Sequence, residues 1–227
     1  MSIDWQTATV VSVTQQTPGF KTLILKPQRL LPFKSGNFVE IGVEKDGANK
    51  CYSIVNSPND NSKTFEIGVK LFSNGELSPK LFRLKVGDEV FLRGPQGAYF
   101  IWEVSSKTTI VIAGGSGICP MISILRQFDP KVGELFLLFS TKHDSIYYKN
   151  ELEEKCREKK VNYSLVQTGK EGRVNKEYLE NKYGKLIGVN TDFYVAGPTE
   201  FVQDVSLWLR ELGVAENNIK TDDFGAD

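Results

Sequence analysis

The sequence has few of the residues that hold metals and metal clusters. It contains one histidine and three cysteines in 227 residues. The cysteines, Cys51, Cys119 and Cys156, lie far apart with no Cys-x-x-Cys spacing. This argues against an iron–sulfur or zinc site built by this chain, and we expect free thiols. The histidine, His143, has no accompanying Gly-x-Ser-x-Gly elbow, so we interpret it as a surface-loop residue rather than a triad member.

Long hydrophobic runs and an excess of one charge are also absent. No apolar stretch approaches the length of a membrane span, and the first residues lack the basic and apolar segments of a secretory signal. We therefore expect a cytosolic protein. Because 28 basic residues balance 28 acidic ones, nothing favours nucleic acid or an anionic membrane as the main partner.

The residues that are present change their pattern midway along the chain. The first half alternates and is rich in β-branched residues, with short strands separated by glycine, proline and asparagine turns. This pattern predicts a small antiparallel β-barrel over 1–103, interrupted by one helix over 77–84. The expected strands are 8–14, 20–26, 38–43, 51–55, 65–70 and 89–93.

The second half, 104–227, alternates strands with helical stretches. That order predicts an α/β domain, Rossmann-like, with a parallel sheet and helices on both faces. The expected strands are 108–113, 135–140, 163–167 and 193–196. The expected helices are 121–128, 145–158, 176–182 and 201–212.

A glycine turn follows the first strand of the second half. The strand over 109–113 leads into Gly114-Gly115-Ser116-Gly117-Ile118-Cys119-Pro120. Gly115 and Gly117 would let a backbone approach a pyrophosphate closely, and the helix after them would offer unpaired N–H groups. An ordinary tight strand-to-helix connection explains the same residues, and the pattern is not the usual Gly-x-Gly-x-x-Gly.

Three other segments have features that suit a cofactor. Lys50-Cys51-Tyr52-Ser53 puts a cation, an aromatic ring and a hydroxyl on one strand, as a flavin requires, although this segment alone favours an edge strand with a core tyrosine. Gly75-Glu76-Leu77-Ser78 opens a helix that suits a phosphate or is simply capped. Ala196-Gly197-Pro198 is another strand-to-helix turn, suited to a nicotinamide pocket or to no ligand at all.

Together, in this order, these four motifs resemble the ferredoxin–NADP reductase family, in particular its bacterial ferredoxin (flavodoxin) reductases. The family pattern is Arg-x-Tyr-Ser, Gly-x-x-Ser, Gly-Gly-Thr-Gly-Ile-Ala-Pro and Cys-Gly-Pro. The likeness runs from about residue 8 to Phe224-Gly225. The resemblance implies an FAD-binding barrel followed by an NAD(P)-binding domain. It also implies hydride transfer between the nicotinamide and the flavin in an interdomain cleft, and then electron transfer to ferredoxin, flavodoxin or a similar carrier.

The resemblance also implies roles for individual residues. Tyr52 would flank the flavin ring and Ser53 would bond near its N5 atom, and these are the candidate catalytic residues. An aromatic residue near the C-terminus commonly covers the flavin in this family, and Phe224 is the candidate. The candidate cofactor-binding set is Lys50, Tyr52, Ser53, Val69, Gly75, Leu77, Ser78, Gly115, Ser116, Gly117, Pro120, Thr168, Lys170, Arg173, Gly197, Pro198 and Phe224.

The sequence departs from the family pattern at three positions. Lys50 replaces an arginine and so lacks its bidentate fork, which predicts weaker hold on FAD. Ala196 replaces a cysteine beside the nicotinamide, which predicts slower hydride transfer. Cys119 replaces an alanine, where we expect packing rather than catalysis.

The sequence is compatible with either NADPH or NADH and with more than one activity. Thr168, Lys170 and Arg173 suit a 2′-phosphate or form a solvated loop, and we lean towards NADPH over NADH. A monomeric, FAD-containing NAD(P)H reductase is the leading hypothesis. The alternatives are a reductase of free flavin, an oxygenase component whose iron–sulfur centre lies on another chain, and a non-catalytic subunit that retains the fold.

Overall fold

The computed structural model describes residues 4–29, 32–60, 63–142, 145–188 and 190–225. These residues divide into two compact units. The first comprises the described residues up to Glu103 together with Ile122–Gln127. The second comprises Val104–Met121 and the described residues from Phe128 onward. The interpretation of His143 as a surface-loop residue concerns a position outside the described residues.

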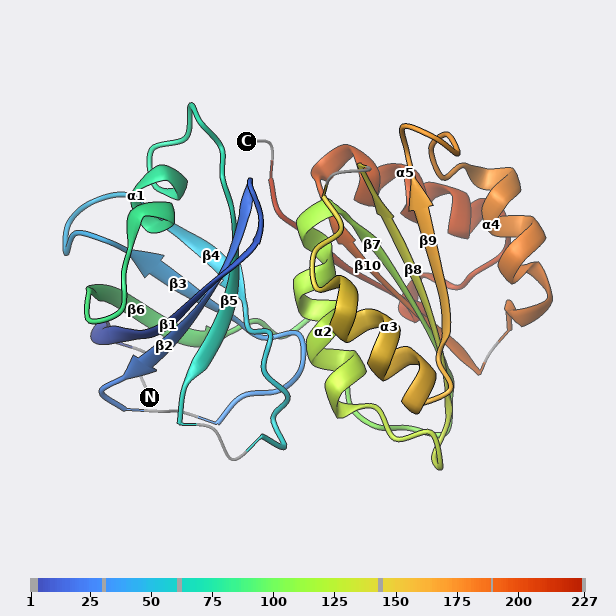
Figure 1. The fold of residues 1–227 in the computed structure, drawn as a ribbon. Coiled ribbons are helices and arrows are strands. Elements are labelled where there is room, and N and C mark those ends of the chain that lie inside the picture. The colour runs from blue at the N-terminus through green and yellow to red at the C-terminus, as the bar shows by residue number, and fades with distance from the viewer. Residues whose placement is uncertain (1–3, 30–31, 61–62, 143–144, 189, 226–227) are drawn as a thin grey trace. The chain divides into compact units, whose positions relative to one another are not determined.

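The first unit is an antiparallel six-stranded sheet with the strand order β4-β3-β6-β1-β2-β5 (Figure 1). Past the end of β4, the Val55 N–H donates to the Glu66 carbonyl on β5 at 2.9 Å, so the two outer strands of the sheet meet. Its elements are β1 (Gln6–Thr17), β2 (Phe20–Pro27), β3 (Phe38–Gly42), β4 (Asn49–Ser53), β5 (Phe65–Lys70), α1 (Ser78–Arg83) and β6 (Glu89–Gln96).

The core of this unit is built from alternate residues of its strands. Val39 and Ile41 of β3 are fully buried, as two-residue periodicity requires of inward-facing positions. Helix α1 adds Leu81 to the same hydrophobic cluster, with Leu77 directly before it. Pro79 lies in the first turn of α1, where its missing N–H has no helical partner to lose.

The second unit is a five-stranded parallel sheet with the order β11-β10-β7-β8-β9. The chain runs outward from β7 through β8 to β9, then returns to the other side of β7 for β10. The strands are β7 (Thr108–Gly114), β8 (Glu134–Thr141), β9 (Asn162–Gln167), β10 (Thr191–Gly197) and β11 (Ile219–Asp223). The helices are α2 (Ile118–Gln127), α3 (Lys149–Glu158), α4 (Lys176–Tyr183) and α5 (Thr199–Glu211), with short 3₁₀ turns at Gly115–Gly117, Gly184–Leu186 and Glu216–Asn218. Only the first four residues of α2 belong to this unit, because Ile122–Gln127 is grouped with the first.

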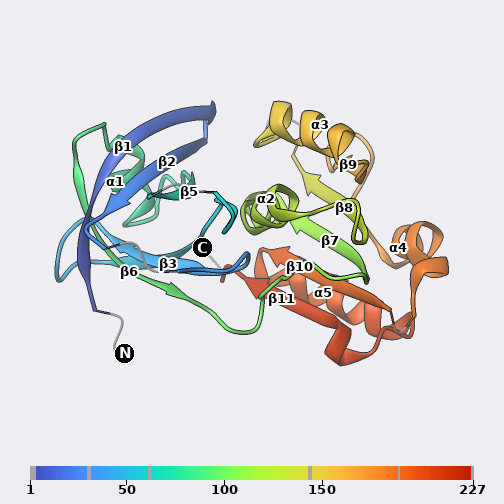
Figure 2. The same cartoon turned by 90° about the horizontal axis from the view of Figure 1, so that it is seen from below.

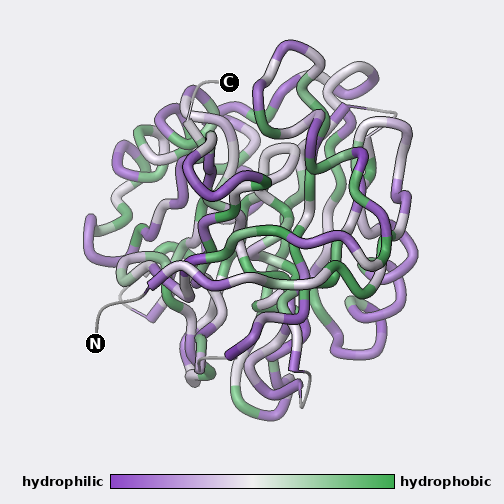
Figure 3. The backbone as a smooth tube through the Cα atoms, turned by 90° about the vertical axis from the view of Figure 1, so that its left-hand side faces the viewer, coloured by the Kyte–Doolittle hydropathy of each residue, from purple (hydrophilic) through white to green (hydrophobic). Residues whose placement is uncertain are grey.

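Helices cover both faces of this sheet. Figure 2 shows α3 along one face and α4 and α5 along the other. Ile110 and Ile112 of β7 pack in one cluster with Leu179 of α4 and with Val205 and Leu209 of α5. Figure 3 colours the backbone by hydropathy, and hydrophilic and hydrophobic stretches alternate along much of its length. The antiparallel barrel and the parallel α/β sheet expected from the sequence are therefore confirmed.

Several elements have bounds that differ from the expected ones; β4, for example, covers 49–53 rather than 51–55. Three further differences concern the second unit. Strand β11 is not indicated by the sequence pattern, because its five residues are polar except for Ile219 and only that residue is buried. The helix expected over 145–158 begins at Lys149, since Tyr148 has a φ of +55° that a right-handed helix cannot include. The helix expected from residue 121 begins earlier, at Ile118.

Two features are absent from the described residues. None of their helices is long and apolar enough to cross a membrane. Nor do these residues contain a group of three or more histidine, cysteine, aspartate or glutamate side chains placed to hold a metal ion.

Helix α5 offers a matched test of the second core. Leu209 is fully buried in that core, whereas Leu207, two residues away, is 50% exposed. We expect Leu209→Ala to lower the free energy of unfolding of this unit by about 2–5 kcal/mol, because it leaves a cavity. Leu207→Ala should change it by less than about 0.5 kcal/mol. Urea unfolding measures both, and equal effects would contradict this packing.

Candidate functional site

The second unit brings two glycine turns together at one edge of its sheet. Strands β7 and β10 are parallel neighbours, with Ala113 opposite Ala196 in the register. Each strand ends in glycine, at Gly114 and Gly197, and each is followed by a helix. The strand order reverses between these two strands, and ligands of open α/β sheets bind outside the carboxyl ends at such a switch point.

Gly115 and Gly117 differ in their surroundings. Gly115 has a φ of +53°, and a Cβ added there would meet nothing within 4 Å. A Cβ on Gly117 would lie 2.1 Å from the Ala196 carbonyl oxygen, so no larger residue fits between the two turns. Gly117 therefore joins the turns at backbone distance, whereas Gly115 leaves open space on the outer side.

Gly114 and Gly197 extend this close packing. A Cβ on Gly114 would lie 2.7 Å from the Phe201 ring of α5. Gly197 has a φ of +151°, and its Cβ would lie 2.8 Å from the Gly114 carbonyl oxygen. Pro198 then directs the chain into α5, which begins at the next residue.

This arrangement suits an anionic group beside Gly115. Ser116 is partly exposed next to it, while Cys119 and Pro120 are buried in the first turn of α2. The amino end of a helix carries partial positive charge, which favours a phosphate. The sequence-predicted residues Gly115, Ser116, Gly117, Pro120, Gly197 and Pro198 thus lie in two adjoining turns.

The last described residues lie at the same edge. Strand β11 pairs with β10, and Asp223 is opposite Gly197. The Phe224 N–H donates to the Gly197 carbonyl oxygen at 3.1 Å, and the Phe224 residue is 36% exposed. Phe224 was predicted from the sequence, whereas its neighbours Asp223 and Thr199, where the Thr199 hydroxyl donates to the Asp223 carboxylate at 2.7 Å, were not. The two consecutive aspartates before Phe224 were the available signal.

The third group of predicted residues follows β9, at the edge of the sheet. The Thr168 N–H donates to the Thr141 carbonyl of β8 at 2.9 Å, which fixes the start of the loop. Lys170 and Arg173 are exposed, and Gly172 between them has a φ of +82°. The loop therefore presents two cations to solvent at the carboxyl end of β9.

In the first unit, β4 carries the predicted flavin residues. Lys50 and Cys51 are exposed, Tyr52 is half-buried, and Ser53 is 7% exposed. Tyr52 packs against the hydrophobic cluster of the barrel, so its ring is supported from the protein side. Such an anchored ring can present a flat apolar face to a ligand.

The polar groups at the start of α1 form hydrogen bonds with the segment that precedes this helix. The Ser78 hydroxyl accepts from the Phe72 N–H at 3.0 Å and donates to the Phe72 carbonyl at 3.2 Å. Leu77 is buried in the core, and so is Val69 on β5. Any contact of Leu77 or Val69 with a phosphate must therefore come from the backbone. A Cβ on Gly75 would lie 3.1 Å from the Ser78 hydroxyl oxygen.

A charged pair lies beside β4 on the neighbouring strand. Glu40 is opposite Cys51 and also opposite Arg93 of β6. Burial alone would raise the pKa of Glu40, but hydrogen bonds from Gln96 and Arg93 outweigh it and hold this pKa below the ordinary value. The Glu40 carboxylate is therefore ionised at neutral pH and paired with Arg93 at 2.5 Å.

The cysteines are free thiols, as expected. Cys119 and Cys156 are buried, and burial raises the pKa of Cys156 to about 12. A thiol with such a pKa is scarcely ionised at neutral pH and is a poor nucleophile. Cys156 is thus a packing residue.

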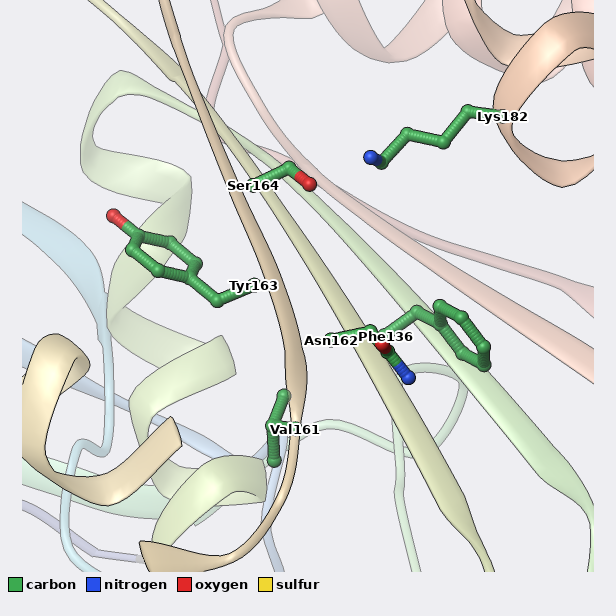
Figure 4. A pocket seen from close by; sticks show the side chains of 6 residues that line it. All are labelled: Phe136, Val161, Asn162, Tyr163, Ser164 and Lys182. Atoms are coloured by element: carbon green, nitrogen blue, oxygen red, sulfur yellow. The ribbon is translucent and has the colours of Figure 1, made fainter. Parts of the chain in front are cut away.

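A shallow pocket lies at a different place in the second unit. It is lined by Phe136 of β8, by Lys182 of α4 and by residues 161–164 at the start of β9. Figure 4 shows Ser164 and Lys182 on one side of β9, with Tyr163 pointing away on the other. Because these positions lie towards the amino ends of the strands, the pocket is not part of the site formed by the glycine turns.

Comparison with known proteins supports the same division of the chain. Residues 6–101 match the family model of an oxidoreductase FAD-binding domain. Residues 111–207 match that of an oxidoreductase NAD-binding domain. The chain is thus an oxidoreductase of the class that joins these two domains in this order, and it belongs to the ferredoxin–NADP reductase family.

Individual relatives point to the same family. The chain is 34% identical over 127 residues to a flavodoxin/ferredoxin–NADP reductase of Shigella flexneri, covering 54% of this chain and 50% of the relative. It is 29% identical over 232 residues to the electron transfer component of toluate 1,2-dioxygenase of Pseudomonas putida, covering 96% of this chain and 67% of the relative.

A solved structure shares the fold of nearly the whole chain. The FAD/NAD-binding domain of a nitric oxide dioxygenase from Vibrio cholerae has a TM-score of 0.81 at 23% identity. The match covers 97% of this chain and 99% of that one. Among curated relatives, by contrast, the chain spans from 39% to 67% of the relative's length.

Gly117 gives the sharpest test of the glycine turns. We expect Gly117→Ala to lower the melting temperature and to abolish binding of pyridine nucleotide, because the added methyl group collides with the Ala196 backbone. Gly188→Ala is the control, since a Cβ there meets nothing within 4 Å. Thermal unfolding and nucleotide titration measure both. Wild-type binding by Gly117→Ala would show that the turns are not packed in this way.

Proposed function

We propose that this protein is an FAD-dependent reductase that takes electrons from NAD(P)H and passes them to an electron-carrier protein. The observation that carries the proposal is the pair of glycine turns at the switch point of the NAD-binding domain, downstream of an FAD-binding barrel. Bound FAD would supply the redox chemistry, accepting a hydride and releasing electrons to the carrier.

In the barrel, the residues of β4 fit a flavin. The half-buried Tyr52 is supported by the core and would provide an apolar face for the ring. Ser53 would hold a hydrogen bond at the N5 edge of the ring, and Lys50 would offer positive charge to the diphosphate. The turn at Gly75, with Leu77, Ser78 and the backbone of Val69, would complete the FAD site.

In the α/β domain, the open space at Gly115 fits a diphosphate. A ligand can reach the backbone there without meeting a side chain, while Ser116, Gly117 and Pro120 shape the turn. Gly197 and Pro198 would border the nicotinamide, with Phe224 beside them. The protein's contribution is orientation of the two reactants rather than acid–base catalysis.

Ferredoxin, flavodoxin or a similar protein is the proposed acceptor. A second candidate acceptor is the oxygenase side of a multicomponent system. It is favoured by the match of 96% of this chain to a dioxygenase electron transfer component. In that case the iron–sulfur centre would lie outside the described chain. We further propose that the protein acts as a monomer in the cytoplasm.

Flavin reduction tests the proposed activity directly. We expect purified protein to carry FAD, with absorbance that bleaches when NADPH or NADH is added without oxygen. Ser53→Ala should slow bleaching by about tenfold, because the free energy of one hydrogen bond corresponds to a rate factor of about that size. Ser12→Ala is the control and should leave the rate unchanged. Ferredoxin, flavodoxin and free FMN are then offered as acceptors. Protein that neither carries nor takes up flavin would refute the proposal, and a preference for free FMN would replace the carrier by a diffusing flavin.

The loop after β9 tests the choice of nucleotide. We propose that Thr168, Lys170 and Arg173 meet the 2′-phosphate of NADPH. The double variant Lys170→Ala, Arg173→Ala should raise the KM for NADPH by about tenfold or more and leave that for NADH unchanged, because only NADPH carries this phosphate. Lys131→Ala is the control, because Lys131 is also an exposed lysine but lies outside this loop. Equal changes in the KM values for NADPH and NADH would show that the loop does not contact the 2′-phosphate.

A further inference from the structure

The last described residues are bonded to the turn that follows β10. Beyond the strand pairing of Asp223 with Gly197, the Phe224 N–H donates to the Gly197 carbonyl at 3.1 Å. Gly197 also packs against Gly114 at backbone distance. Gly197 therefore links the segment 223–225 to both glycine turns.

One carboxylate oxygen fixes this segment a second time. Oδ1 of Asp223 accepts a hydrogen bond from the Thr199 hydroxyl at 2.7 Å and another from the Gly225 N–H at 2.8 Å. Thr199 is the first residue of α5, so the carboxylate also lies at the positive end of that helix. The start of α5 and the segment 223–225 are thus joined at one atom.

The core does not explain this contact. Asp223, Phe224 and Gly225 are all exposed, and Thr199 is only half-buried. The core of the domain is formed instead by residues such as Phe193, Val195 and Leu209, which are fully buried. An exposed hydrogen bond of this kind adds little to global stability, but it is strong enough to set the position of a short terminal segment.

We propose that Thr199 and Asp223 are positioning residues for pyridine-nucleotide binding. Their hydrogen bond keeps the segment 223–225 on the Gly197 turn, so that Phe224 is a fixed wall beside the nicotinamide end of the nucleotide. This inference rests on the proposed function. Without the bond, the segment has to be ordered each time a nucleotide binds, and the ordering lowers the affinity.

Thr199→Val tests the proposal, because it keeps the shape of the side chain and removes the hydroxyl donor. We expect amide hydrogen exchange at Phe224 and Gly225 to become about threefold to tenfold faster in the nucleotide-free protein. The Kd and KM for the nucleotide should rise by a similar factor, with kcat and the melting temperature unchanged. Thr199→Ser, which retains the hydroxyl, should behave as the wild type, and so should Thr221→Val on the exposed side of β11.

Each other outcome has a distinct meaning. Unchanged exchange at Phe224 and Gly225 would show that the hydrogen bond does not hold the segment. Faster exchange with unchanged Kd and KM would show that the segment is held but does not position the nucleotide. A wild-type protein that binds no pyridine nucleotide would overturn the proposed function. The exchange rates would then still report whether the Thr199–Asp223 bond holds the segment 223–225.

Discussion

The close packing of two glycine turns is the constraint on which the rest of the second domain depends. Gly117 leaves no room for a Cβ against the Ala196 carbonyl, and Gly197 leaves none against Gly114. Because β7 and β10 are parallel neighbours, these contacts bring the amino ends of two helices to one edge of the sheet. A single methyl group would separate them. The same packing leaves Gly115 on the open side, where a backbone-lined surface faces solvent.

The barrel satisfies a different requirement. Its strand β4 keeps Lys50 and Cys51 exposed, while Tyr52 and Ser53 are progressively buried. A ring supported by a packed core keeps one orientation, which is what a stacked cofactor needs. The Ser78 hydroxyl, by contrast, is occupied by both polar groups of the Phe72 backbone. The turn before α1 is therefore better suited to bind through its backbone than through this side chain.

Many of the strands, and the glycine turn after β7, could be predicted from the sequence. Strong alternation gave the barrel strands, and β-branched runs followed by glycine gave β7 and its turn. Strand β11 was missed because its residues are polar and it is recognised only by its pairing with β10. The start of α3 was misplaced because nothing in the sequence marks Tyr148 as left-handed. Both errors come from tertiary contacts overriding local pattern.

The amino-acid sequence was enough to predict the fold class, the family and a set of candidate cofactor ligands, because periodicity and short motifs are local properties of the chain. The surroundings of those residues follow from the three-dimensional fold. The fold placed Gly117 against Ala196, enclosed the Val69 and Leu77 side chains in the core, and joined Thr199 to Asp223. These contacts form because strands that are far apart in the chain become neighbours, and the order of strands in a sheet is not a property of any local segment.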